Sequence, residues 1–195
     1  MNIAHRKRVQ SRLLLLAGLA LLLAGGYALY VVFSPALKVI GLNPNDNATT
    51  RSIDKQEYNQ NRLYIPAIDV NVPFGPSEDD LLDGAWWRKS ANGNPQDGGN
   101  FVLAAHRFEL GVTPRQTQQK SPFYHIAKLK TGDTIVVDYN NERYMYTITK
   151  KYSVAPTAVE IENRTTEPRL TLYSCTLGGS SDGRDVIIAD LMDLR

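Results

Sequence analysis

The sequence predicts a mainly β protein, a small closed β-barrel with short helices, preceded by one transmembrane helix. The first observation is a series of short runs rich in Val, Ile, Leu, Thr and Tyr, separated by turn residues. The second is the scarcity of helical periodicity after residue 61. The third is a long apolar stretch near the N-terminus. The strand pattern alone would also suit a β-sandwich.

The apolar stretch covers residues 13–33 and contains no charged residue. At 1.5 Å per residue it can cross a hydrocarbon core of about 30 Å. The basic residues of the preceding segment, residues 1–12, predict a cytoplasmic tail and an extracytoplasmic remainder: His5, Arg6, Lys7, Arg8 and Arg12. The alternative is a cleaved signal peptide, whose apolar region is only about 7–15 residues long. Because Pro35 also makes a poor cleavage site, we expect an uncleaved signal anchor.

Residues 34–61 are polar and predict an extracytoplasmic linker, a flexible tether with an r.m.s. span of roughly 25–30 Å. Within it, residues 53–58 give a helical pattern too short to interpret. Residues 62–195 then form a domain of ordinary size for one compact unit, which we interpret as the β-barrel.

Composition excludes several classes of function. The formal net charge is only +2, and no basic cluster interleaved with aromatic residues occurs in the domain, so we expect no nucleic-acid partner. The single cysteine rules out an internal disulfide. Because the sequence has no cluster of His, Cys and Asp at metal-ligand spacing and no glycine-rich phosphate loop, we expect no metal and no cofactor.

The domain contains six predicted strand segments. The first includes Pro66, which suits an edge strand or a bend. The second is apolar throughout, as in a barrel wall. The third and fourth flank Asn140-Asn141-Glu142, which indicates a hairpin. In chain order the segments are residues 62–70, 100–105, 134–139, 143–148, 169–174 and 185–191.

Helical signals are few. Ser121 followed by Pro122 predicts a capped helix over residues 121–127, because serine caps helix N-termini and proline is favoured at the first helical position. Residues 156–162 predict another short turn.

Three chemistry-bearing residues stand at or just beyond predicted strand ends: His106, Cys175 and Arg184. A thiol, an imidazole and a guanidinium are the groups that thiol-based acyl transfer requires. Each also has an ordinary interpretation, because a lone cysteine in an apolar run is usually a buried small hydrophobe. The other histidine of the domain, His125, lies among apolar residues in the predicted helix and is expected to serve packing.

The stretch Thr171-Leu172-Tyr173-Ser174-Cys175, with Arg184 after a short loop, resembles the Thr-Leu-x-Thr-Cys signature of sortases. These are membrane-anchored cysteine transpeptidases of bacterial cell surfaces. Residues 63–68, the Gly99-Asn100 that leads to His106, and residues 129–133 match further sortase elements in the same order. The resemblance implies an eight-stranded β-barrel in which His106, Cys175 and Arg184 take the catalytic positions.

Two positions depart from the family pattern. Ala105 stands where a glycine usually precedes the histidine, and Ser174 replaces threonine before the cysteine. Both changes are small and bear on subclass more than on chemistry. We include Ala105 and Ser174 as candidate substrate-binding residues.

The roles follow from the chemistry of the groups. The Cys175 thiolate attacks a peptide carbonyl and becomes a thioester, while His106 acts as general acid and then as general base. Arg184 holds the substrate carbonyl or the oxyanion. The resemblance implies that the substrate is a Leu-Pro-x-Thr-Gly-like C-terminal sorting signal of a surface protein, cut between Thr and Gly. It also implies that the acceptor is a cell-wall precursor or pilin amine.

The expected location is the bacterial cell membrane, spanned once, with the N-terminus cytoplasmic, the catalytic domain at the cell surface and lipid contacting the anchor. Two alternatives stay open: a membrane-anchored thiol peptidase that releases its acyl group to water, and a non-catalytic module that binds sorting signals. The short connection over residues 150–168 leaves little room for an elaborate specificity loop.

Overall fold

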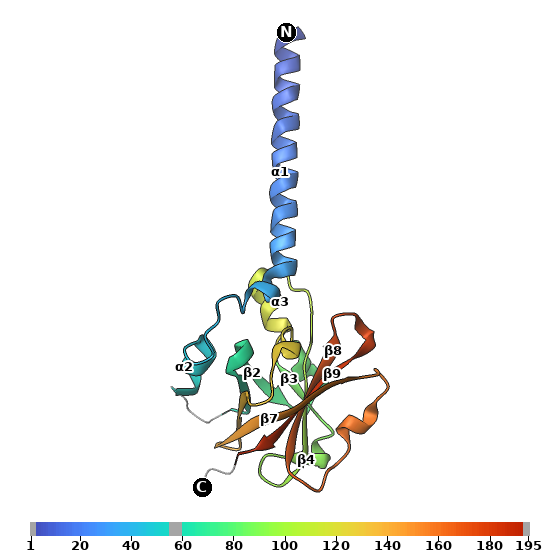
Figure 1. Ribbon diagram of the computed structural model, residues 1–195. Coiled ribbons are helices and arrows are strands. Elements are labelled where there is room, and N and C mark those ends of the chain that lie inside the picture. Colours follow the sequence, from blue (N-terminus) through green and yellow to red (C-terminus); the bar gives the residue numbers. More distant parts are fainter. Residues whose placement is uncertain (1–2, 55–59, 193–195) are drawn as a thin grey trace.

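The computed structural model describes residues 3–54 and 60–192, without the side chains of residues 3–9 and 11. A β-barrel carries one long helix that projects from it as a rod (Figure 1). The strands lie in the order β3-β2-β1-β6-β7-β9-β8-β5-β4, and β3 also pairs with β5. That pairing closes eight strands into a barrel and leaves the two-residue β4 as an appendage on β5. The predicted closed barrel is confirmed, and the sandwich alternative is excluded.

The described residues contain nine strands, most of them antiparallel to their neighbours. Two pairs are parallel, β2 with β3 and β5 with β8. In chain order the strands are β1 (Arg62–Ile65), β2 (Val70–Gly75), β3 (Ala85–Arg88), β4 (Gly93–Asn94), β5 (Gly98–Ala104), β6 (Thr134–Tyr139), β7 (Glu142–Val154), β8 (Arg169–Thr176) and β9 (Gly179–Leu191).

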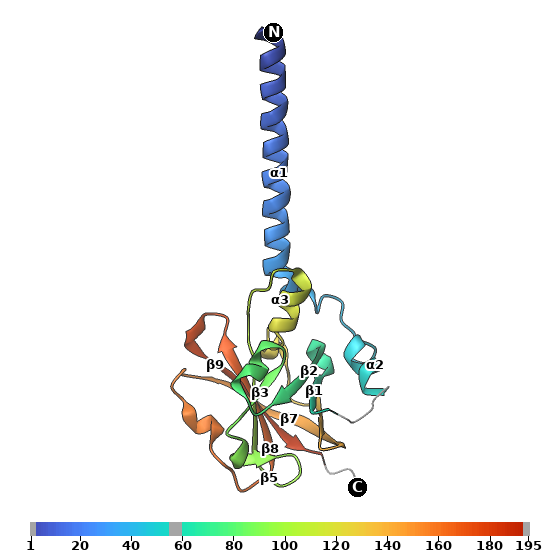
Figure 2. The same cartoon turned by 180° about the vertical axis from the view of Figure 1, so that it is seen from behind.

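The described helices are short, apart from the first. They are α1 (Ile3–Leu37), α2 (Ala48–Asp54), α3 (Pro114–Lys120) and the single-turn 3-10 helices η1 (Pro66–Ile68), η2 (Glu78–Leu82), η3 (Ser90–Asn92), η4 (Ile126–Lys128) and η5 (Val159–Glu162). Figure 2, from behind, shows α2 beside β1 and β2, and α3 beneath the end of α1.

The predicted segments correspond to seven of the nine observed strands, but β2 continues to Gly75, β7 continues to Val154 and β9 begins at Gly179. The predicted strand over residues 62–70 is a hairpin, because Pro66 starts a 3-10 turn between β1 and β2. Strands β3 and β4 were missed, since neither shows an alternating pattern. The hairpin between β6 and β7 is confirmed: Asn140 and Asn141 have φ of 50° and 64°, which a two-residue type I′ turn requires.

The helix predicted over residues 121–127 is wrong in position. The helix is α3, which spans Pro114–Lys120 and so precedes the predicted segment. Thr113 and Pro114 carry the same signal of a capping residue followed by proline, and the Thr113 side chain accepts a bond from the Gln116 N–H (3.2 Å). Ser121 is instead the residue that ends α3. The predicted turn over residues 156–162 is present as η5.

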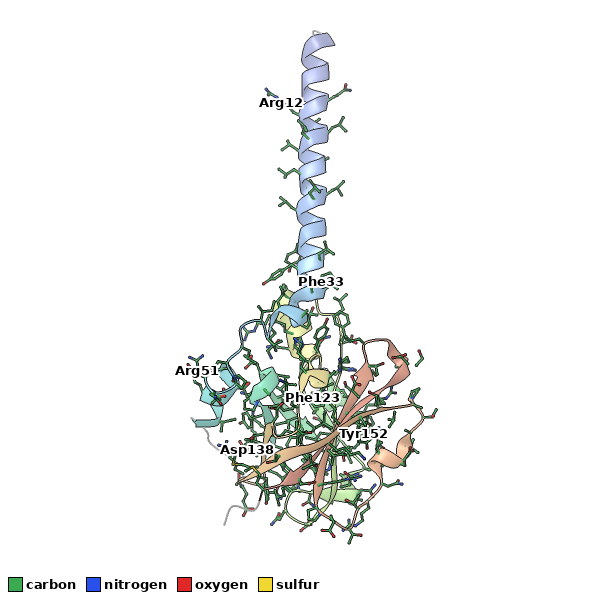
Figure 3. The ribbon with its side chains drawn as sticks, viewed as in Figure 1. Arg12, Phe33, Arg51, Phe123, Asp138 and Tyr152 are labelled. Atoms are coloured by element: carbon green, nitrogen blue, oxygen red, sulfur yellow. The ribbon has the colours of Figure 1, made fainter. Side chains whose placement is uncertain are left out.

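The barrel interior is a single apolar core to which every strand except β4 contributes. At the closing seam, the ring of Trp87 on β3 meets the ring of Phe101 on β5 edge-on, with centroids 5.6 Å apart. Phe74 on β2 meets the same ring at 5.4 Å. Figure 3 shows side chains crowded within the barrel, whereas those of α1 project into open space. Burying a large apolar side chain contributes about 1.5–3 kcal/mol, so this core is the main stabilising term of the barrel.

Helix α1 is long and apolar enough to cross a membrane over residues 12–37. Most of its side chains are exposed, but its last turns are docked on the domain, where Ser34 is fully buried. The Ser34 hydroxyl donates to the carbonyl of Pro114 (2.9 Å), and the Gln118 amide donates to the carbonyl of Ser34 (3.0 Å). The C-terminal end of α1 is therefore held against the domain by hydrogen bonds to α3.

The segment after α1 is also bound to the barrel, although the sequence predicted a flexible tether within residues 34–61. The Asn47 amide donates to the carbonyl of Pro66 (2.7 Å), and the Thr49 hydroxyl donates to the Asp69 carboxylate (2.8 Å). The polar side chains that suggested a solvated linker instead satisfy groups of the β1–β2 turn. The tether prediction is corrected for residues 38–54, while residues 55–59, including part of the weak helical pattern, lie outside the described residues.

Candidate active site

Two of the predicted site residues face each other across a strand pair. Strands β8 and β9 are antiparallel, and their register places Cys175 directly opposite Arg184. Directly opposed residues project from the same face of a sheet, with Cβ atoms about 4.5–5.5 Å apart. The hairpin that joins these strands lies on the side of the barrel from which α1 emerges (Figure 1).

His106 follows the strand on the other side of β8. Strand β5 runs parallel to β8, with Ala104 beside Tyr173, and the Ala105 N–H donates to the Tyr173 carbonyl (3.3 Å). Parallel strands end at the same edge, so extending this register by two residues brings His106 beside Cys175. By this register, the backbones of all three predicted residues lie at one end of the barrel. Each is half-buried, which leaves it accessible to a substrate.

The guanidinium of Arg184 is held by its own hairpin. Its Nη1 donates to the carbonyls of Ser180 (2.9 Å) and Gly183 (3.0 Å). The Thr176 hydroxyl donates to the Asp182 carboxylate across the same hairpin. Because a guanidinium has five N–H donors and these bonds use only Nη1, Nε and Nη2 can still serve a substrate oxygen.

A buried ion pair lies directly behind the site. Arg107, next to His106, donates from Nη1 to the Asp185 carboxylate at 2.9 Å, and Asp185 is next to Arg184. The other carboxylate oxygen accepts a bond from Ser153 (2.8 Å) on β7. Burial lowers the pKa of Arg107, and Asp185 opposes this effect. Sequence reasoning missed the pair, although its members' adjacency to two site residues was a usable signal.

A second polar network fixes the connection between β7 and β8. The Glu162 carboxylate receives bonds from the Arg88 guanidinium (2.7 Å) and from the Tyr173 hydroxyl (2.5 Å). Burial alone would raise the pKa of Glu162, but these bonds outweigh it and hold the pKa of this carboxyl below its usual range. Burial and the bond to Glu162 raise the pKa of Tyr173. Since Tyr173 is two residues before Cys175, this network supports the strand that carries the thiol.

Ala105 and Ser174, the candidate substrate-binding residues, are both buried, with 5% and 2% of their surface exposed. Ala105 belongs to the apolar core, and the Ser174 hydroxyl donates to the carbonyl of Cys175 (3.0 Å). This placement puts them beneath the site, and a direct contact with substrate stays a prediction.

The other histidine of the barrel domain has a structural position. His125 is buried, and its Nε2 lies 2.8 Å from the carbonyl of Pro35 in α1. Burial lowers the pKa of His125, so the ring is neutral at pH 7 and Nε2–H is the donor in this bond. This agrees with the expected packing role.

Two hollows of the structure lie away from the three site residues. One of about 590 Å³ is bounded by Lys38, Arg62 and Arg115 among others, and it contains none of the three site residues. Within the described residues, no group of three or more His, Cys, Asp and Glu could hold a metal.

Comparison with known proteins identifies the family. The model of the sortase domain matches residues 63–192, which is the whole described barrel apart from its first residue. The chain belongs to the sortase family. This sortase is 29% identical to sortase A of Bacillus anthracis over 147 residues, which are 74% of this chain and 64% of that protein. The chain therefore spans less than two thirds of that relative's length.

Solved sortases have the same fold. Sortase A of Listeria monocytogenes superposes with a TM-score of 0.57 and 26% identity, covering 70% of this chain and 89% of that one. Sortase E1 of Streptomyces coelicolor, solved with a tripeptide in its active site, gives 0.55 and 25%, covering 69% and 88%. The predicted sortase-type barrel is confirmed.

Proposed function

We propose that this sortase is a cysteine transpeptidase that cleaves a Leu-Pro-x-Thr-Gly-like sorting signal and transfers the acyl part to an amine. The observation that carries the proposal is the register of β8 and β9, which sets Cys175 opposite Arg184, with His106 two residues beyond the end of the neighbouring β5. Membership of a family of cysteine transpeptidases supports it.

In the first half-reaction, the Cys175 Sγ thiolate attacks the carbonyl carbon of the threonine residue in the signal, and an S–C bond forms. Arg184 donates to the carbonyl oxygen as it becomes an oxyanion. The C–N bond then breaks, and His106, as imidazolium, donates its proton to the departing glycine amine. The product is a thioester on Cys175, and His106 is left neutral.

In the second half-reaction, an acceptor amine attacks the thioester carbonyl. Neutral His106 takes the proton of that amine, a new C–N bond forms and the Cys175 thiolate departs. The acceptor is a cell-wall precursor or pilin amine. Transfer needs no electron donor or acceptor, because no atom changes oxidation state.

The protein spans the bacterial cell membrane once through α1, with residues 1–12 in the cytoplasm and the barrel at the cell surface. The length and apolar character of residues 12–37 support the span. The basic residues of the N-terminal tail support the orientation.

Full-length protein in detergent micelles, incubated with a set of Leu-Pro-x-Thr-Gly-like peptides and diglycine, tests the proposal. A peptide joined to diglycine, detected by mass and lost in Cys175→Ala, is the expected product. Cleaved peptide without a diglycine product would identify a hydrolase instead. Binding that survives in Cys175→Ala, with no cleavage by the wild type, would identify a binding module.

A further inference from the structure

The loop between His106 and α3 exposes three large apolar side chains within five residues. Phe108, Leu110 and Val112 are 40%, 53% and 82% exposed. A single exposed apolar residue is normal on a soluble surface, but adjacent ones form a patch that marks an interaction site. We call residues 108–112 the apolar loop.

The apolar loop lies beside the point where α1 leaves the domain. It leads directly into α3, and α3 is bonded to the last turns of α1 through Ser34, Pro114 and Gln118. In Figure 1 the yellow-green trace before α3 runs alongside the lower end of α1, and Figure 3 labels Phe33 at that height. The candidate membrane span of α1 ends at Leu37. The loop therefore stands at the level where the helix would leave a bilayer.

Backbone groups of the apolar loop already have partners within the protein. The N–H groups of Glu109, Gly111 and Val112 donate to the side chains of Ser121 (2.9 Å), Thr117 (3.1 Å) and Gln116 (3.0 Å), respectively. An irregular loop in contact with lipid loses water as a hydrogen-bond partner, so its backbone groups must be satisfied internally. These three bonds satisfy three of the five backbone N–H groups of the apolar loop.

We propose that the apolar loop enters the lipid interface of the membrane that α1 spans, with Val112 deepest. The exposed side chain of Glu109 keeps a charge on the loop, which places it at headgroup level and not in the hydrocarbon core. Arg115, exposed on α3, is the cation available to lipid phosphates. This inference rests on the proposed membrane anchoring.

The membrane contact has a consequence for the active site. The apolar loop starts two residues after His106, and α1 is fixed to α3 and to His125. Two attachments, helix α1 and the apolar loop, restrict the orientation of the barrel on the membrane more than α1 alone would. The end of the barrel that carries Cys175 thus keeps a defined height and tilt above the lipid.

The test measures depth in the bilayer with a nitroxide on single cysteines. Full-length protein carrying Cys175→Ala and Val112→Cys is labelled and reconstituted in vesicles of phosphatidylcholine and phosphatidylglycerol. Because Val112 is 82% exposed, the label does not disturb packing. Leu23→Cys in α1 serves as the deep reference, and Val159→Cys, 72% exposed on η5, as the aqueous one. The orange η5 lies far from α1 in Figure 1.

The readout is the ratio of collision rates with oxygen, which concentrates in lipid, and with a water-soluble nickel complex. We expect the ratio at position 112 to be at least threefold above that at 159 and below that at 23. A ratio at 112 equal to that at 159, with a high ratio at 23, would overturn loop insertion and leave the anchoring intact. A low ratio at 23 would overturn the anchoring and this inference with it.

Discussion

The ion pair between Arg107 and Asp185 links the segment after β5 to β9, and its removal tests whether this link is needed for catalysis. Replacing Asp185 by asparagine keeps the size and an acceptor oxygen but removes the charge. The Arg107 side chain, only 7% exposed, is then left with an uncompensated charge. The change touches none of the three proposed catalytic groups directly, but Asp185 is next to Arg184 in the chain and its partner Arg107 is next to His106.

The expected size of the effect follows from burial. Removing one partner of a buried ion pair costs about 3–5 kcal/mol. Because the Asp185 side chain is 16% exposed, we expect the lower end, about 3 kcal/mol of unfolding free energy. A displacement of about 1 Å in a catalytic group can reduce the rate about 100-fold. We therefore expect kcat for transfer to fall about 10- to 100-fold in Asp185→Asn, with little change in KM.

The assay measures unfolding by urea and transfer kinetics on the same preparations, at a temperature where all variants are folded. The matched control is Asp138→Asn, which breaks the buried pair with Arg143 (2.7 Å) at the β6–β7 hairpin. Figure 3 labels Asp138 at the lower left, on the side away from α1. The control should lose comparable stability and keep its kcat. Unchanged kcat in Asp185→Asn, or an equal loss in the control, would show that the pair serves stability alone.

Three further predictions follow. His106→Gln should reduce transfer at least 100-fold, whereas His125→Gln should retain it, as product formation by mass will show. The lowered pKa of Glu162 means that the unfolded chain binds more protons below about pH 4.5, so stability contributed by this group is present above that pH and is lost as pH falls through the folded pKa. Urea titrations from pH 6 to 3 should show a smaller acid loss in Glu162→Gln. Gly99→Ala should destabilise the barrel more than Gly132→Ala: both have positive φ (81° and 94°), but only at Gly99 would a Cβ meet a carbonyl oxygen, at 2.5 Å.

Each of these has a clear contrary outcome. Full loss of transfer in His125→Gln, with the fold intact, would show that His125 is required and that the assignment of His106 as the general base is wrong. Identical acid titrations of wild type and Glu162→Gln would mean that the carboxylate gains nothing from its partners. Equal losses at the two glycines would show that backbone strain, and not the close approach at Gly99, sets the cost.

Local patterns predicted the parts of the fold that local physics decides. The apolar run into β5 and the two asparagines of the β6–β7 hairpin each specify their structure without distant partners. The proximity of Cys175 and Arg184 has the same local origin, since a strand, a short loop and a returning strand bring them opposite each other.

What the sequence could not supply depends on contacts between distant segments. Closure of the barrel by β3 and β5 relies on Trp87 packing against Phe101, and no local sequence pattern predicts that pairing. The docking of α1 relies on Ser34 and His125, which look unremarkable in the chain. The predicted tether failed because polar composition does not distinguish side chains in water from side chains that cap a neighbouring turn.

The central claim is that Cys175 carries the acyl group, and intact-mass analysis of the protein during turnover tests it most directly. With a Leu-Pro-x-Thr-Gly-like peptide and no added amine, we predict a mass increase equal to the acyl fragment. Peptide mapping should place it on Cys175, and diglycine should discharge it. Transfer to diglycine that continues in Cys175→Ala, or an adduct on another residue, would contradict the account.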